Sequence, residues 1–243
     1  MIRRLLFFAC FLSLIGPVRS AEAQSDHGFR FVRIQYGLDS GGGMGRFGGA
    51  PWSHDYPTAE LNFYEALERT TAIRTVEQPV VLTLLDKAIF EHPVLYLCEP
   101  GYWTAEDDEI NRLRAYLERG GFILFDDFRG EDEWDNLVYQ MARVFPDRAF
   151  TDVPPNHPIW DIYYDIDSVE APSNVRGGRF GGGFSKFDDR YLALFDDNGR
   201  MMALVCHNQD IGDGWEWPER NFEDASTISF QMGINFLVYA LTH

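Results

Sequence analysis

The hydrophobic and polar positions of this chain change repeatedly between the spacing of strands and the spacing of helices. Residues 29–36 alternate apolar and polar side chains, which predicts a half-buried strand. Two continuous apolar runs, 94–98 and 122–125, predict buried strands, and residues 80–82 predict a shorter one. Because helical patterns separate these runs, the chain is expected to form an α/β fold.

The helical segments show apolar residues three and four positions apart. One such helix runs through residues 61–71, and Asp55 is expected to cap its N-terminus. A second helix covers 104–119, where Thr104 starts a predicted capping box and a glycine pair ends the helix. A third helix carries apolar residues through 134–145. Each of these helices has one apolar face, so each is expected to pack against a sheet.

The C-terminal part has a different pattern. Apolar runs at 191–195 and 200–206 flank Asp197-Asn198-Gly199, which is a strong signal for a β-hairpin. Residues 225–241 form a nearly all-apolar helix whose polar interruptions argue against a membrane span and favour burial. The whole pattern predicts a three-layer sandwich with a mainly parallel central sheet, a C-terminal β-hairpin and a buried C-terminal helix.

The N-terminus has the composition of a secretory signal peptide. Arg3 and Arg4 precede an apolar stretch at residues 5–15, and small residues that permit cleavage after Ala23 follow it. The apolar stretch is well short of the ~20 residues that a membrane-spanning helix needs. We therefore expect residues 1–23 to be removed and residues 28–243 to act as one domain in the periplasm or outside the cell. Retention of the segment as an anchor is the alternative.

The charge of the chain narrows the range of partners. The chain has 38 acidic and 21 basic residues, which gives a formal net charge of −17. Nucleic acids and anionic membranes would be repelled by such a surface. We therefore expect a small ligand or an envelope protein as partner, with neither nucleic-acid binding nor stable membrane insertion after cleavage. A divalent cation as cofactor is compatible with the charge.

Two cysteines, Cys98 and Cys206, follow the predicted signal peptide, and each ends a strand-like apolar run. Export would permit a disulfide between them. Two buried free thiols are the favoured interpretation, because cysteines in strands commonly pack as small hydrophobic residues. No Cys-x-x-Cys or Cys/His spacing typical of zinc occurs, so the motifs predict no metal site.

The most informative stretch is the strand at 122–125, which is followed directly by Asp126 and Asp127. Ligands of open α/β sheets bind beyond the carboxyl ends of the parallel strands. Three other segments should end at the same edge and carry acids, histidines and tryptophans. Candidate catalytic residues are Asp126, Asp127 and His207, and candidate ligand-binding residues are His54, Asp55, Glu99, Asp210, Trp215 and Glu216. Imidazole and carboxylate groups together suit acid–base chemistry or a hard metal ion.

Each of these candidates also has a structural interpretation. Acids at such positions can cap helices or make local bonds in turns, as expected for Asp55 and Asp210. Trp215 is either packed at the rim or a stacking platform for a sugar or an aromatic ligand. The Asp126–Asp127 pair can equally cap a following helix or pair with arginine residues.

Three segments, 52–60, 120–127 and 210–216, resemble the bacterial domain of unknown function family 4159. The resemblance extends over nearly the whole chain after the predicted signal peptide. It implies a fold similar to class I glutamine amidotransferases. Those enzymes need a cysteine nucleophile on a strand-to-helix turn, but Asp126 or Asp127 stands at that place here. The partner histidine would be His207, but it is followed by Asn-Gln instead of Pro-Glu. The resemblance therefore argues against amidotransferase activity.

Two functions stay open from the sequence. The first is a non-catalytic module that binds a ligand or an envelope partner in a cleft at the strand ends. The second is a hydrolase that uses Asp126, Asp127 and His207 at the same place, with or without a divalent cation. The fold cannot decide between them, because function depends on the site and not on the scaffold.

Overall fold

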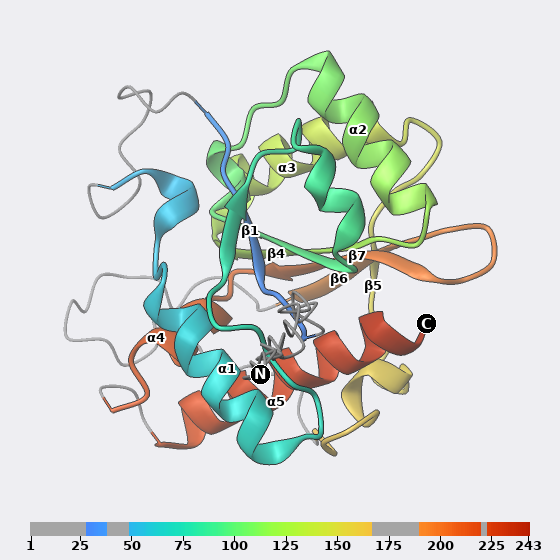
Figure 1. The fold of residues 1–243 in the computed structure, drawn as a ribbon. Coiled ribbons are helices and arrows are strands. Elements are labelled where there is room, and N and C mark those ends of the chain that lie inside the picture. Colours follow the sequence, from blue (N-terminus) through green and yellow to red (C-terminus); the bar gives the residue numbers. More distant parts are fainter. Residues whose placement is uncertain (1–27, 38–48, 167–189, 220–222) are drawn as a thin grey trace, which may run out of the picture.

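A seven-stranded sheet runs through the centre of the molecule in the computed structural model (Figure 1), which describes residues 28–37, 49–166, 190–219 and 223–243. The strand order is β2-β1-β3-β4-β7-β6-β5. The first five strands in this order are parallel, and β6 is antiparallel to both of its neighbours. The strands are β1 Val32–Ile34, β2 Val80–Leu82, β3 Val94–Cys98, β4 Phe122–Phe128, β5 Thr151–Asp152, β6 Arg190–Phe195 and β7 Met201–His207. The predicted signal peptide, residues 1–23, lies outside the described residues.

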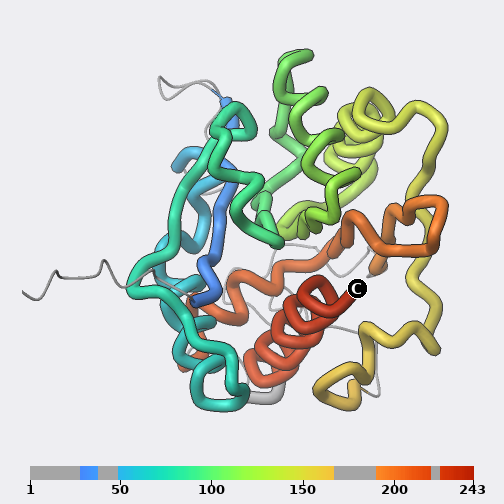
Figure 2. The backbone as a smooth tube through the Cα atoms, turned by 45° about the vertical axis from the view of Figure 1, so that its right-hand side comes forward, coloured from blue at the N-terminus to red at the C-terminus, as the bar shows by residue number. Residues whose placement is uncertain are grey.

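Helices cover both faces of this sheet (Figures 1 and 2). Helices α2 and α3 pack on one face, and α1, α4 and α5 pack on the other, so that each face has its own hydrophobic core. The helices are α1 Thr58–Thr70, α2 Asp107–Glu118, α3 Gly130–Val144, α4 Ile211–Glu216 and α5 Glu223–Thr242, with short 3-10 helices at Pro51–Ser53, Lys87–Glu91, Pro100–Tyr102 and Pro158–Trp160. The prediction of a three-layer α/β sandwich is confirmed.

The central unit β3-α2-β4 matches the prediction closely. Strands β3 and β4 are parallel neighbours, with Val94 beside Phe122 at one end and Cys98 beside Asp126 at the other. The hairpin β6–β7 and the apolar C-terminal helix α5 are also present. The capping box of α2 was expected to start at Thr104, but it starts two residues later. Glu106, not Thr104, precedes the helix, and its N–H donates to the Glu109 carboxylate at 2.9 Å.

Two local expectations at the N-terminal side are wrong. Only residues 32–34 of the expected strand 29–36 form β1, and all three are buried, because the strand lies between two others and beneath helices on both faces. The polar residue Arg33 therefore lies inside the protein and not in solvent. Asp55 does not cap α1, which begins at Thr58 after Pro57, and its carboxylate accepts no hydrogen bond.

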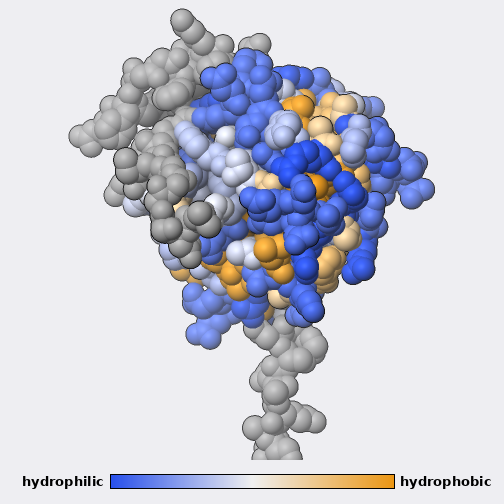
Figure 3. Space-filling view, turned by 90° about the horizontal axis from the view of Figure 1, so that it is seen from above, coloured by the Kyte–Doolittle hydropathy of each residue, from blue (hydrophilic) through white to orange (hydrophobic). Residues whose placement is uncertain are grey.

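The remaining predictions concern the thiols and the surface. Cys98 and Cys206 are both buried and free, as expected. Within the described residues, no helix is both long and apolar enough to cross a membrane. The face seen in Figure 3 is mostly hydrophilic and is interrupted by smaller hydrophobic areas. Such a mixed surface gives no single large apolar patch on this side.

Candidate functional site

A β-bulge places the two adjacent aspartates at the end of β4. Phe125 is paired with Val205 of β7, and Phe128 is paired with His207, so β4 has one more residue than β7 in this interval. Asp127 has a φ angle of +56°, in the left-handed region. A bulge changes the direction in which side chains point. As a result, Asp126 and Asp127 take different partners although they are neighbours in the sequence.

Asp126 is completely buried and accepts hydrogen bonds at both oxygens. The N–H groups of Ile211 and Gly212, at the start of α4, donate to it at 3.2 and 2.9 Å. The Tyr96 hydroxyl donates at 2.9 Å. Burial and the neighbouring charge of Asp127 raise its pKa to about 6, against the opposing effect of these hydrogen bonds. Asp126 thus fixes the start of α4 beside the strand end.

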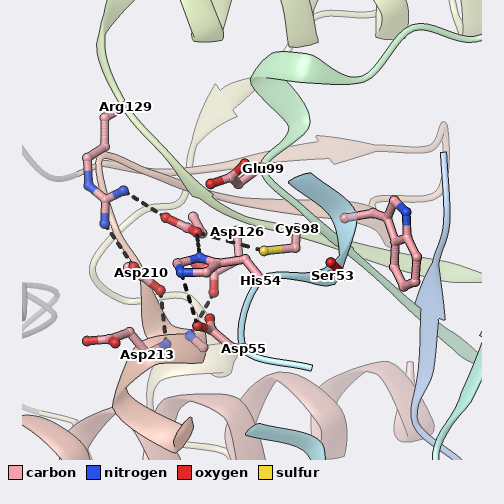
Figure 4. Close-up of polar contacts among 12 residues, drawn as sticks. Ser53, His54, Asp55, Cys98, Glu99, Asp126, Arg129, Asp210 and Asp213 are labelled. Carbon is pink, nitrogen blue, oxygen red and sulfur yellow. Dashed lines mark hydrogen bonds and ion pairs between the residues drawn. The ribbon is translucent and has the colours of Figure 1, made fainter. Parts of the chain in front are cut away.

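Asp127 lies between two cationic groups. Its Oδ2 atom is 2.5 Å from Nδ1 of His54, and Arg129 donates to its Oδ1 atom at 2.7 Å. Although burial acts in the opposite direction, His54 and Arg129 hold the pKa of this carboxyl well below its usual range. Arg129 also donates to Asp210 at 3.0 Å, which connects two chain segments (Figure 4). Asp127 is therefore ionised and held at both oxygens.

His54 is the partly exposed member of this group, with 24% of its side chain accessible. Burial lowers its pKa, but the hydrogen bond and the charge of Asp127 outweigh this and raise it to about 9. Its Nε2 atom is 3.5 Å from Oδ1 of Asp55. The Asp55 side chain is fully buried, and neither of its oxygens accepts a hydrogen bond. Burial and the nearby charges of Asp210 and Asp127 raise its pKa well above the usual value.

We call the polar residues at this edge the strand-end cluster. They come from the loop before α1, the ends of β3 and β4, and the loop before α4 (Figure 4). The strand-end cluster consists of His54, Asp55, Cys98, Asp126, Asp127, Arg129 and Asp210.

A buried ion pair supports the loop that carries His54. Arg33 of β1 and Glu60 of α1 are both fully buried, and Nε of Arg33 donates to Glu60 at 2.5 Å. Arg33 also donates to the carbonyl oxygens of Trp52 and His54, at 3.1 and 2.7 Å. Its guanidinium carbon lies 4.8 Å from the centre of the Tyr96 ring. Arg33 was not among the expected site residues, because the alternation of residues 29–36 placed it on a solvent-facing side of the strand.

Unusual backbone conformations gather at the same edge. In the described part of the chain, four residues other than glycine have positive φ angles. All four lie at the carboxyl end of a parallel strand or in the loop before α1, and they are Asp55, Glu99, Asp127 and Asn208. Such conformations have a free-energy cost and concentrate where a protein must hold groups in fixed positions. Their distribution points independently to the strand-end cluster.

The structure separates two predicted residues from this cluster. The His207 ring packs between Phe128 and Trp134, and its Nε2 atom is 3.2 Å from the Gly130 carbonyl oxygen. Burial lowers its pKa. Trp215 is 1% exposed and belongs to the core, so it is not a stacking platform at the surface. His207 and Trp215 therefore lie apart from the polar cluster and pack within the fold.

Two further candidates lie beside the cluster. Glu99 is buried at the end of β3, and its N–H donates to the Asp126 carbonyl oxygen at 3.0 Å. Glu216 lies near Asp55 and Asp213, because one ligand atom of each of these residues is within 4.8 Å of the others. Arg129 was not identified as a site residue from the sequence, because only the folded structure brings it next to Asp210.

Two cavities of about 340 and 420 Å³ lie at the opposite edge of the sheet. One is beside the β6–β7 turn and includes Arg148 and Asp197. The other is beside the starts of β3 and β4 and includes His92 and Gly121. Neither cavity is lined by the strand-end cluster, whose side chains instead contact one another.

The fold and the site together define an α/β sandwich with a polar, charged centre at the carboxyl ends of its parallel strands. A family model described as a domain of unknown function, DUF4159, matches residues 30–241, and the chain belongs to this family. No curated protein matches the chain. The predicted family is thus confirmed, and the likeness to glutamine amidotransferases stays a prediction.

Proposed function

We propose that this protein is a binding module that takes a positively charged ligand at the strand-end cluster. The observation that carries the proposal is the buried Asp55 carboxylate, which accepts no hydrogen bond. Burial of a carboxyl group whose oxygens accept no hydrogen bond disfavours its ionised form, which is why the pKa of Asp55 is raised, and a cationic ligand would favour that ionised form. Neighbouring acids add to the negative charge around Asp55, since Asp210, Asp127 and Glu216 raise its pKa and the buried Arg33 is the opposing cation.

Binding fits this geometry better than catalysis by the aspartates. Both oxygens of Asp126 and both oxygens of Asp127 are already held by donors of the protein itself. A carboxylate in that state is not available to attack a substrate. His54 is protonated at neutral pH, because its pKa is raised to about 9, and a protonated imidazole cannot act as a general base.

A thermal-shift screen tests the proposal. The cationic probes are spermidine, glucosamine and triarginine, and the anionic controls are glucuronate and inorganic phosphate. We expect at least one cationic probe to raise the melting temperature of the wild type, and Asp55→Asn to lose this response. Asp135→Asn, which changes an exposed carboxylate on α3, should keep it. An equal response in Asp55→Asn, or a response to the anionic probes alone, would contradict the proposal.

A hydrolase is the second candidate, and the His54–Asp127 contact is the observation that favours it. Arg129 fixes Asp127, which in turn holds the imidazole by Nδ1. The partly exposed, protonated imidazole could donate a proton to a leaving group. Turnover of p-nitrophenyl esters or phosphates that disappears in His54→Gln would support this function. No turnover of either substrate class by the wild type would count against it.

We further propose that the protein acts outside the cytoplasm. The basic and apolar pattern of residues 3–15 supports this localisation. N-terminal sequencing of the exported protein should give a start near Gln24. A membrane-bound form that retains Arg3 and Arg4 would show that the segment is an anchor.

A further inference from the structure

We propose that the strand-end cluster is a binding site for one zinc-like transition metal ion, with His54, Asp55, Cys98 and Asp127 as its ligands. This inference rests on the proposed function, because it names the ligand class of the same site. The four residues come from three chain segments, the loop before α1 and the ends of β3 and β4, so no sequence motif reveals them. Figure 4 shows the side chains of His54, Asp55 and Cys98 close to one another.

The distances suit a single ion. One potential ligand atom from each residue lies within 4.8 Å of all the others. Sγ of Cys98 is 3.8 Å from Oδ2 of Asp127, and Nε2 of His54 is 3.5 Å from Oδ1 of Asp55. Two ligands of a tetrahedral zinc ion, bonded at 2.0–2.3 Å, are about 3.3–3.5 Å apart. These two distances are within a few tenths of an ångström of that separation, whereas the 2.5 Å contact between His54 and Asp127 would have to lengthen by about 1 Å to admit the ion.

A second observation points to a cation as the partner of Asp55. Asp55 has a fully buried side chain next to His54, and neither carboxylate oxygen has a hydrogen-bond donor. Space for a donor is limited on the side of α4, because a Cβ atom at Gly212 would lie 2.9 Å from Oδ2 of Asp55. Buried charges in proteins are paired or coordinate metals. A metal ion supplies the positive charge that no described residue gives to Asp55 through a hydrogen bond.

The surroundings prepare Asp127 for the same role. Arg129 holds its Oδ1 atom at 2.7 Å and leaves Oδ2 directed at His54 and Cys98. Groups that hold a ligand from behind are typical of metal sites. On binding, the ion would take the place of one imidazole proton of His54 and of the Cys98 thiol proton, and both protons would pass to solvent. His54, with 24% of its side chain accessible, provides the route of entry.

The donor set also predicts which metals bind. Sulfur and imidazole nitrogen favour zinc and cobalt over magnesium and calcium, which prefer oxygen ligands. Asp55 belongs to a second, all-oxygen group with Asp213 and Glu216. If that group were the binding site, magnesium or calcium would bind without any contribution from the thiol. Coordination by the Cys98 sulfur therefore distinguishes the proposed site from the all-oxygen group.

Cobalt titration of the purified full-length chain tests this inference, with the thiols kept reduced. Cobalt bound to a thiolate gives a charge-transfer band in the near ultraviolet, whereas cobalt bound to oxygen and nitrogen alone does not. We expect the band to saturate at one cobalt ion per chain, to disappear when zinc is added, and to persist in excess magnesium.

Matched variants assign the ligands. Cys98→Ser should abolish the band, whereas Cys10→Ser and Cys206→Ser, which change the other two cysteines, should retain it. Asp55→Asn should weaken zinc binding at least tenfold in a competition titration, and Asp135→Asn should leave it unchanged. If Cys98→Ser does not fold, the comparison of Asp55→Asn with Asp135→Asn decides the question by affinity.

Three results would overturn the metal site: no band in the wild type, a band that persists in Cys98→Ser, or unchanged zinc affinity in Asp55→Asn. The proposed function has a separate readout. If metals do not bind but spermidine, glucosamine or triarginine stabilises the protein through Asp55, the metal inference fails and the proposed function stands. If neither metals nor these organic cations bind, both are wrong.

Discussion

Asp127 shows how single residues set the charge state of this site. It lies between His54 and Arg129, with contacts of 2.5 and 2.7 Å, and it is almost completely buried. Burial alone would favour a neutral acid, but two cations at hydrogen-bond distance favour the carboxylate. The same contacts keep His54 protonated, so the ionisation of one residue depends on that of the other.

A titration of His54 by NMR in metal-free protein tests this coupling. We expect its pKa to be about 9. Asp127→Asn should lower the midpoint clearly, because the hydrogen bond and charge of Asp127 are the largest effects that raise it, whereas Asp210 and Glu99 continue to raise it. Since the pKa is raised on folding, the His54 contribution to stability is full below about pH 6.5 and is lost as pH rises through 9. A midpoint near 6.5 in both proteins would contradict the coupling.

The buried pair Arg33–Glu60 should be important for stability. Glu60→Gln leaves the guanidinium buried without a counter-charge, which typically costs about 3–5 kcal/mol. We expect a loss of this order in the free energy of unfolding, measured by urea denaturation. Glu65→Gln is the matched control on the same helix, because Glu65 and its partner Arg69 are 68% and 75% exposed, and little change is expected. A similarly small effect of Glu60→Gln would show that Arg33 has another partner.

Among the secondary-structure elements, the bulge of β4 and the start of α4 form one structural unit. Asp126 accepts the first two N–H groups of α4, and Gly212 allows the helix to approach the strand end closely. A Cβ atom at position 212 would lie 2.8 Å from the Tyr96 hydroxyl and 2.9 Å from Oδ2 of Asp55. The start of α4, the end of β4 and the Asp55 carboxylate therefore pack tightly against one another.

Gly212→Ala is expected to disturb this packing. The added methyl group must displace Asp55, Tyr96 or the helix, so cation binding should weaken at least tenfold and the melting temperature should fall. Gly49→Ala is a suitable control, because its Cβ atom would meet only the Ser53 hydroxyl, at an ordinary 3.8 Å. Equal binding by Gly212→Ala and the wild type would place the ligand away from Asp55. Circular dichroism would show whether either variant has lost its fold.

The strands and helices were predictable where the spacing of hydrophobic residues along the sequence was clear. The apolar runs of β3 and β4 and the hairpin signal at Asp197-Asn198-Gly199 gave correct strands. The bulge was not predictable, because the extra residue appears only when β4 is aligned with β7. The burial of Arg33 was also missed, since strict alternation suggests a solvent-facing side, whereas helices cover both faces here.

In the whole molecule, the parallel topology decides which predicted residues meet. Strands β3 and β4 end side by side, which brings Cys98 next to Asp127 although 29 positions separate them. The rule for strand ends thus located His54, Asp55, Asp126, Asp127 and Asp210 from the sequence. It failed for His207 and Trp215, because a position at the strand end does not determine whether a side chain points outward or into a core. The pairing of residues far apart in the sequence, such as Arg129 and Asp210, could be identified only from the folded structure.

An anomalous difference map from crystals of the protein grown with zinc would decide whether the strand-end cluster binds a cation. We expect one strong peak within bonding distance of His54, Asp55, Cys98 and Asp127, at about 2.0–2.3 Å from each ligand atom. The 2.5 Å contact between His54 and Asp127 should lengthen as the ion enters. Peaks confined to exposed carboxylates, with the His54–Asp127 contact unchanged, would contradict a cation site at this edge of the sheet.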